Sequence, residues 1–320
     1  MKAPGLGTGS RPSARTGAPR WRRAVGADIP ALSAFLREGE ERRVGFSGRL
    51  LREAGFGASA SVRLPSPLRG AVWLVDVEDA SAAAPSASDG PEIAGAVLCH
   101  PSRLVFPIFP ASNDDREAGI SLLASSFPPA SVTGMTEDVE RYESALSLEP
   151  LASVAYRMMA RAECERQPLD ATVPGHPELS IRRAFLADLA ALLPLQEAYE
   201  REEVLTRIHR FNPAACKASL ARALERQLVF AAEEGGVIVA KAGTNARGFA
   251  VDQIGGVYTL PSRRGRGIAF ALMAALLAEI SDQGRSPALF VKPSNAAACA
   301  LYRGLGFDDI GDYRADYFEA

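Results

Sequence analysis

The stretch at residues 255–269, GGVYTLPSRRGRGIA, decides the fold of the C-terminal half of this chain. A β-type run ends at Pro261, a basic turn with two glycines follows, and the apolar segment FALMAALLAEI continues as a helix. Backbone N–H groups at a helix start lack intrahelical partners and lie at the positive end of the helix dipole. Glycines there let an anion approach these groups closely. The stretch therefore predicts a strand, an anion-binding turn and a helix.

Two spaced patterns carry a resemblance to a known family. Arg264, Gly267 and Ala269 form R-x-x-G-x-A at the predicted start of the helix. Residues 295–307, NAAACALYRGLGF, match N-x-x-A-x-x-L-Y-x-x-x-G-F, in which Asn295 can cap a second helix. The first pattern alone is weak, but it follows a strand and opens an amphipathic helix, which is the context such a motif needs. Together the two patterns resemble the coenzyme A site of the GNAT N-acetyltransferases.

The resemblance covers about residues 179–318 and implies that acetyl-CoA is the co-substrate, with no metal. It implies that the N–H groups of residues 264–269 hold the pyrophosphate, and those of Val257 and Thr259 the acetyl carbonyl and the pantetheine arm. It also implies a bulge at Gly255 and Gly256 that splays two strands to admit pantetheine. The alternatives are a plain strand–helix connection and an ordinary sheet bulge. The residues that the resemblance places at the coenzyme are Val257, Tyr258, Thr259, Arg264, Gly265, Arg266, Gly267, Ile268, Ala269, Asn295, Ala298 and Tyr302.

The resemblance implies direct transfer of the acetyl group to a primary amine, without a covalent enzyme intermediate. Tyr302 falls where the family often places a phenol beside the coenzyme sulfur, and a phenol can protonate the departing thiolate as a general acid. The alternative is that Tyr302 packs its ring in the core and finds a polar partner for its hydroxyl.

Three carboxylates are candidates for the base that takes a proton from the amine. Glu202 and Glu203 end the first helix of the C-terminal unit, near where the family's substrate channel opens, and Asp252 lies on the strand that leads into the bulge. Each is alternatively a solvated surface charge. Tyr199, His209 and Lys241 are further candidates for the wall of the channel, with core or surface positions as the alternative. The final list of catalytic candidates is Tyr302, Glu203 and Asp252.

Composition excludes several classes of protein. The chain has 320 residues, 47% of them hydrophobic, so it can bury a sizeable core and its length favours two domains. The formal net charge of -2 gives no general attraction for nucleic acid or acidic membranes. The cysteines, at 99, 164, 216 and 299, lack metal-site spacing and suit a reduced, cytoplasmic protein. No segment approaches the apolar length of a membrane span.

The organisation along the chain predicts a tail and two α/β units. Residues 1–20 read as a disordered tail, 21–170 as an N-terminal α/β domain, and 179–320 as a GNAT domain, with the boundary in a proline-rich stretch near 170–178. The N-terminal half also runs from helices into paired strands, so it is interpreted as a degenerate GNAT-like domain that lacks R-x-x-G-x-G/A. Two roles are open for it: a roof over the acceptor site or a contact with a second copy, the protein being a monomer or a homodimer.

The predicted elements give a fold class of α/β with a mixed, mostly antiparallel sheet. They are listed by residue number: helices in 28–56, strands at 70–79 and 92–100, a helix at 121–127, a β stretch at 130–133, a helix at 136–146, strands at 153–162 and 179–184, helices at 188–204 and 213–227, three strands within 228–259 joined by turns at 233–236 and 243–248, then a helix, a strand at 288–292, a helix at 295–305 and a final strand at 307–318.

Two other functions compete with the acetyltransferase hypothesis. A non-catalytic acyl-CoA-binding module would keep the anion-binding turn and act through partner contacts. An aminoacyl-tRNA-dependent transferase can also contain tandem GNAT-like units, but the near-neutral charge and the intact coenzyme pattern argue against it. The expected partner is a small-molecule or peptide amine, with no nucleic acid and no membrane, and the sequence does not identify which amine.

Overall fold

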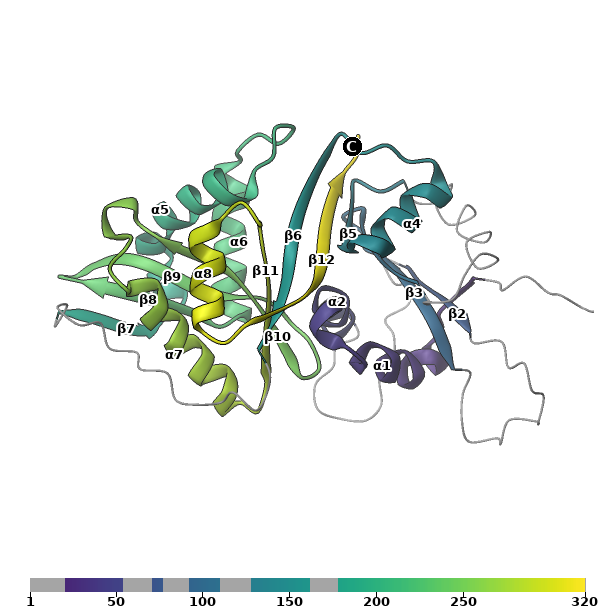
Figure 1. Cartoon of the computed structure of the whole chain (residues 1–320), viewed down its shortest axis with the longest axis horizontal. Helices are drawn as coiled ribbons and strands as arrows, with labels where there is room; N and C mark the ends of the chain where they lie inside the picture. Colours follow the sequence, from purple (N-terminus) through teal and green to yellow (C-terminus); the bar gives the residue numbers. More distant parts are fainter. Residues whose placement is uncertain (1–20, 54–70, 77–91, 110–127, 162–177, 320) are drawn as a thin grey trace, which may run out of the picture.

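The structure is a computed structural model that describes residues 21–53, 71–76, 92–109, 128–161 and 178–319 (Figure 1). Its strands are β1 (Arg22–Arg23), β2 (Ala71–Asp76), β3 (Ile93–Cys99), β4 (Leu104–Ile108), β5 (Ser131–Met135), β6 (Ala152–Ala160), β7 (Leu179–Arg183), β8 (Val229–Glu234), β9 (Val237–Arg247), β10 (Val251–Thr259), β11 (Ser286–Val291) and β12 (Asp308–Tyr317). Its helices are α1 (Ile29–Arg37), α2 (Val44–Glu53), α4 (Thr136–Leu146), α5 (Leu189–Tyr199), α6 (Pro213–Arg226), α7 (Ile268–Asp282) and α8 (Ala296–Gly304).

All the strands join one 12-stranded sheet, in the order β1-β2-β3-β4-β5-β12-β6-β11-β10-β9-β8-β7. Only β4 with β5 and β10 with β11 pair in parallel, and every other neighbouring pair is antiparallel. The predicted mixed, mostly antiparallel α/β fold is thereby confirmed.

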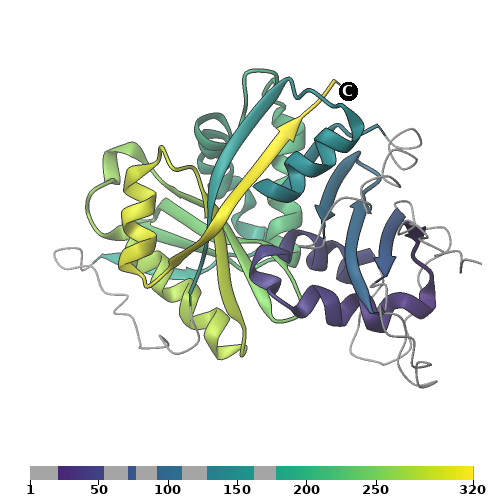
Figure 2. The same cartoon turned by 45° about the vertical axis from the view of Figure 1, so that its right-hand side comes forward.

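The two halves of the chain exchange their last strands at the centre of this sheet. Strand β6 leaves the N-terminal half to pair with β11, and β12 returns from the C-terminal half to pair with β5. The two exchanged strands also pair with each other, with Tyr156 opposite Tyr313 (Figures 1 and 2). Exchange leaves no open sheet edge between the halves, because each last strand has hydrogen-bonding neighbours on both sides.

Helices cover both faces of the C-terminal half. Successive residues of β8 face opposite sides, so Phe230 packs in the core under α7 and α8 while Ala231 packs in the core under α5 and α6. Helix α7 is apolar around most of its circumference and is the most buried helix of this half. In the N-terminal half, α1 and α2 cover one face and α4 the other. No helix of the described part is long and apolar enough to cross a membrane.

Several predicted elements are confirmed and three details differ. The turn at 233–236 has both glycines at positive φ, and Asn212 caps α6 by accepting a hydrogen bond from the N–H of Ala215, 3.0 Å away.

The second predicted turn at 243–248 is wrong, because β9 continues to Arg247 and the chain reverses at 248–250. The sequence interpretation also missed β1, which has only two residues, and β4, which contains Pro107, a residue uncommon inside strands.

Other predictions fall outside the described residues. They concern the tail at 1–20, the loop at 81–90, the helix at 121–127 and almost all of the boundary stretch at 170–178. The division of the chain into domains at 21–170 and 179–320 stays a prediction. Of the cysteines, Cys99, Cys216 and Cys299 are buried free thiols, and Cys164 lies outside the described residues.

Candidate active site

The turn before α7 presents unpaired backbone donors. Gly265 and Gly267 adopt φ of 74° and 79°, which side-chain-bearing residues rarely accept, and Gly267 is the N-cap of α7. Ala271 N is the first donor of the helix, to Gly267 O at 3.1 Å. Within the described chain, no acceptor is found for the N–H groups of residues 265–270. The predicted anion-binding turn therefore has the backbone geometry that an anion requires.

Strand β10 carries the predicted bulge. Gly255 pairs with Gly243 and Tyr258 with Lys241, so Gly256 and Val257 together oppose the single residue Ala242. Gly256 adopts φ of 66°, and its glycine identity is required there for that reason. The bulge predicted at these two glycines is confirmed.

Lys241 fixes the orientation of the bulge. Its Nζ donates a hydrogen bond of 2.8 Å to Gly256 O and lies 4.7 Å from the centre of the Tyr199 ring. In a trans peptide the C=O and N–H bonds point in opposite directions. The N–H of Val257 therefore points away from Lys241. Burial lowers the pKa of Lys241 to about 8, so the ammonium form still dominates at pH 7.

A cavity of about 480 Å³ lies where β10 and β11 stop pairing and separate. Their parallel pairing ends at Ile254 and Leu289, just before the bulge. The cavity brings together residues that the two sequence patterns predicted separately, namely Gly255, Gly256, Val257, Asn295, Ala298 and Tyr302. It also has aromatic walls that sequence reasoning missed, formed by Tyr156 of β6, Phe290 of β11, and Tyr313 and Tyr317 of β12.

Tyr302 lies in this cavity, and its hydroxyl carries its proton. The residue is buried on α8, its ring makes an edge contact with Phe307, and burial raises the pKa of its hydroxyl well above the usual value. No hydrogen-bond partner for this hydroxyl is found in the part of the chain that the structure describes. Tyr302 can therefore donate its proton to a group that enters the cavity.

A π-helical turn, Glu200–Val204, continues α5. Its adjacent residues Glu202 and Glu203 make different contacts. Glu202 accepts hydrogen bonds from Tyr258 at 3.1 Å and from Arg264 at 2.9 Å. Glu203 lines the cavity, accepts 3.1 Å from the amide of Asn295 and lies 3.5 Å from Lys292 Nζ. Of the two glutamates, only Glu203 faces the cavity.

The structure does not bring Asp252 to the cavity. Its carboxylate is fully buried and lies 3.1 Å from the guanidinium group of Arg247 and 2.7 Å from that of Arg285. Asp252 precedes the bulge on β10. Charge-assisted hydrogen bonds from the two guanidinium groups hold the carboxylate in place, and Asp252 is not among the residues that line the cavity. Asp252 therefore braces β10 in this structure.

The remaining predicted residues divide between the two sides of the sheet. Tyr199 lines the cavity, and Lys241 lies beside it at the bulge. His209 makes an edge contact with Tyr317, one of the wall residues, with 4.8 Å between the ring centres. Tyr258 faces the α5 and α6 side. Thr259 O accepts a 3.0 Å hydrogen bond from Arg264, so the Arg264 side chain braces the end of β10.

The N-terminal half has a cavity of about 1110 Å³ at its own parallel pair, β4 and β5. That pairing ends at Val105 and Val132, so Pro107 occupies the position that Gly256 has in the other half. Proline has no N–H, and β4 pairs with β3 without a bulge. Without a bulge, this cavity lacks a peptide turned out of the ladder like the one that carries the N–H of Val257 in the C-terminal site.

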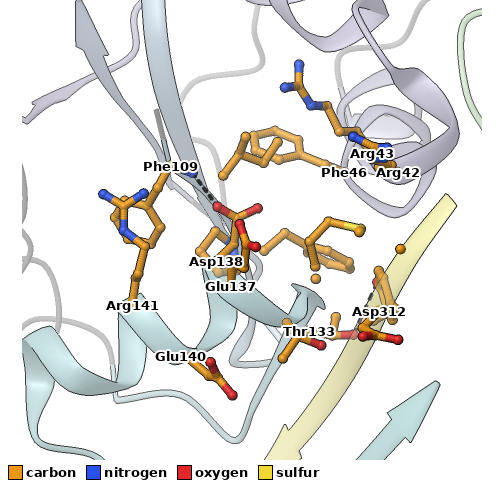
Figure 3. Close-up of a pocket in the computed structure, with 18 of the residues that line it drawn as sticks. Arg42, Arg43, Phe46, Phe109, Thr133, Glu137, Asp138, Glu140, Arg141 and Asp312 are labelled. Atoms are coloured by element: carbon orange, nitrogen blue, oxygen red, sulfur yellow. Dashed lines mark hydrogen bonds between the residues drawn. The ribbon is translucent and has the colours of Figure 1, made fainter. Parts of the chain in front are cut away.

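Mixed charge distinguishes this N-terminal cavity (Figure 3). Arg42, Arg43 and Arg141 line it together with Glu137, Asp138, Glu140 and Asp312. Asp138 projects from α4 and accepts a 2.8 Å hydrogen bond from Phe109 N, and burial raises the pKa of its carboxyl to about 6. The surroundings are unlike those of the C-terminal cavity, so the two halves have diverged in chemistry.

Comparison with known proteins agrees with this geometry. Residues 191–307 match the model of the acetyltransferase (GNAT) family, which supports acyl-CoA-dependent acetyltransferase activity in general. The search of curated protein sequences gave no match.

Three solved structures cover 94% of this chain. A Drosophila protein has 14% identity over 99% of its own length and a TM-score of 0.61. A GNAT-family acetyltransferase from Colwellia psychrerythraea has 12% identity over its full length and a TM-score of 0.54. A tandem GNAT protein from the clavulanic acid biosynthesis pathway has 12% identity over 99% of its length and a TM-score of 0.50. At such identities the likeness concerns the fold. The chain has the fold of tandem GNAT proteins, and its residues 191–307 match the model of the GNAT acetyltransferase family.

Proposed function

We propose that the C-terminal half transfers an acetyl group from acetyl-CoA directly to a primary amine. The observation that carries this proposal is the run of unpaired N–H groups at residues 265–270, next to a cavity that opens at a strand bulge. The run suits the coenzyme pyrophosphate, and the cavity suits the pantetheine arm. A cytoplasmic location and a monomeric or dimeric state remain predictions.

In this proposal the bulge and the cavity supply the groups that acyl transfer needs. Acetyl-CoA brings an activated thioester, whose C–S bond breaks as the C–N bond forms. The N–H of Val257 donates to the carbonyl oxygen as negative charge develops there, and Lys241 holds that peptide in place. Tyr302 gives its proton to the departing sulfur. Glu203 takes a proton from the ammonium of the acceptor and passes it to solvent. The second proton that the nitrogen loses, after the C–N bond forms, restores the Tyr302 phenol, so one proton is released overall.

Tyr302→Phe is expected to lower kcat about 100-fold, because in the proposed mechanism its phenol protonates the departing thiolate. The dissociation constant of acetyl-CoA should not change, since the hydroxyl acts only when the bond breaks. The measurements are thiol release with a panel of primary amines and calorimetric titration of acetyl-CoA. Tyr142→Phe, which removes a buried hydroxyl from α4 in the N-terminal half, is the control and should retain full activity. Acetyl-CoA binding without thiol release for any amine would instead indicate a non-catalytic acyl-CoA-binding module.

Lys241→Met is expected to lower kcat about tenfold at saturating acceptor, because the bulge peptide loses the group that orients it. The dissociation constant of acetyl-CoA should stay the same, since Lys241 lies on the other side of the peptide from the cavity donor. A change in thermal stability with an unchanged kcat would show that Lys241 has only a structural role.

A further inference from the structure

A second cavity of about 470 Å³ adjoins the proposed site on the face that α5 and α6 cover. The two cavities share Tyr199, Asn245, Gly255 and Gly256, so they meet at the bulge. A molecule in the second cavity can therefore place one end at the bulge, where the acetyl group is expected. This is the position that an acceptor requires.

The second cavity is lined by cations. Arg49 and Arg52 come from α2, Arg222 and Arg226 from α6, and Lys241 from β9. Its other lining residues, among those that the structure describes, include no aspartate or glutamate. A concave surface with one sign of charge concentrates field lines and attracts small ions of opposite charge. The arginine fork matches carboxylate and phosphate oxygens in particular.

The two α6 arginines differ from several other arginines of the C-terminal half, which pair with carboxylates. Arg247 and Arg285 pair with Asp252, Arg263 with Glu234, and Arg264 with Glu202. In the described chain, by contrast, Arg222 and Arg226 have no acidic partner, and the contact of Arg222 is a 3.0 Å hydrogen bond to the Ser219 hydroxyl. Their charge is therefore available to a ligand of the cavity.

Close packing between the two halves of the chain positions the α2 arginines. Gly48 of α2 lies against the end of β9, where an added Cβ would be 3.0 Å from Arg247 O. Arg49 is held by a 2.8 Å hydrogen bond to Gly45 O and lies 4.5 Å from the centre of the Phe106 ring. The N-terminal half thus contributes cationic side chains to a cavity of the C-terminal half.

We propose that the acceptor is a small anionic primary amine, whose carboxylate or phosphate binds among the arginines of α2 and α6 while its amine reaches the bulge. This rests on the proposed acetyl transfer. It assigns the N-terminal half a part in acceptor binding, since two of the four arginines belong to α2. The dimensions of the cavity suit a metabolite better than a protein surface, because its 470 Å³ holds a molecule of ordinary small-ligand size.

The test compares amines that differ in charge. O-phosphoethanolamine and ethanolamine form one matched pair, and β-alanine and β-alaninamide the other, so the two pairs separate phosphate from carboxylate recognition. Each compound is titrated by calorimetry into the full-length protein, with and without saturating coenzyme A. The expected result is that one or both of the amines that carry a phosphate or carboxylate bind at least about tenfold tighter than the matched amine that lacks this group.

The double variant Arg222→Gln/Arg226→Gln should weaken that binding about tenfold or more, because two of the cations are lost. Its control, Lys217→Gln/Arg210→Gln, removes two exposed charges from the same half outside the cavity and should bind like the wild type. Equal binding of the amines with and without the phosphate or carboxylate, no binding of any, or binding of the phosphate- or carboxylate-bearing amine that the double variant retains would each overturn the proposal. Acetyl-CoA titration in parallel distinguishes these results from failure of the proposed acetyl transfer, in which acetyl-CoA itself does not bind.

Discussion

Gly267→Glu is expected to weaken acetyl-CoA binding at least about 100-fold, the largest functional effect of any single change considered. Two effects act together. Gly267 has φ of 79°, which residues with a Cβ adopt only with strain, so the turn must shift. The new carboxylate would also lie at the N-terminus of α7, among the N–H groups that we propose hold the pyrophosphate, and would repel it. Calorimetric titration of acetyl-CoA measures the loss.

Gly284→Glu is the matched control for this change. Gly284 has φ of 67° in the turn just after α7, and an added Cβ there meets nothing. The control therefore introduces the same charge and a similar backbone strain at the opposite end of the same helix. It should lose stability of about 1–2 kcal/mol, like Gly267→Glu, and bind acetyl-CoA like the wild type. Wild-type affinity in Gly267→Glu would show that the turn is not the coenzyme site.

Glu40→Ala is expected to lower the free energy of unfolding by about 4 kcal/mol, the largest effect on stability. Glu40 belongs to the N-terminal half and is 3% exposed. Its carboxylate accepts backbone hydrogen bonds from the turn between β9 and β10, from Phe249, from Ala250 at 2.8 Å and from Val251 at 3.2 Å. Alanine would leave these buried donors without an acceptor. Urea unfolding measures the change.

The exposed Glu38, two residues earlier, provides the control. Glu38→Ala should change the unfolding free energy by less than about 0.5 kcal/mol, since the side chain is at the surface. In Glu40→Ala the α2 arginines should also lose their placement, because Glu40 lies just before α2 and its hydrogen bonds hold the β9–β10 turn, while α2 itself contacts β9 and β10. Similar stability of the two variants would mean that Glu40 does not hold the halves together.

Local sequence was enough to predict the parts of the site that lie within one element or one turn. The glycines at 265 and 267 impose positive φ on the turn before α7 whatever surrounds it. Asn295 caps α8 by accepting from Ala298 N at 3.1 Å, an interaction between residues three apart. The bulge at Gly255 and Gly256 was likewise predicted, because glycine pairs in a strand commonly mark such a break.

The sequence did not show which of the candidate carboxylates line the cavity, because their local sequence surroundings are similar. Asp252, Glu202 and Glu203 are all carboxylates near the expected channel, but the first two are held by arginines outside the cavity. Which carboxylate meets which guanidinium depends on side chains 5 to 62 positions apart. No periodicity or spacing carries that information.

The sequence by itself determined the strand, turn and helix that form the proposed coenzyme site, because backbone conformation there follows from glycine and from neighbours a few residues away. Only the tertiary structure decided that β6 and β12 exchange, that their tyrosines become walls of the cavity, and that arginines from positions 49, 52, 222 and 226 meet. The alternation of apolar and polar residues along a strand indicates which face is buried, but it does not indicate which strand lies beside it. Partner choice comes from the packing of the whole chain.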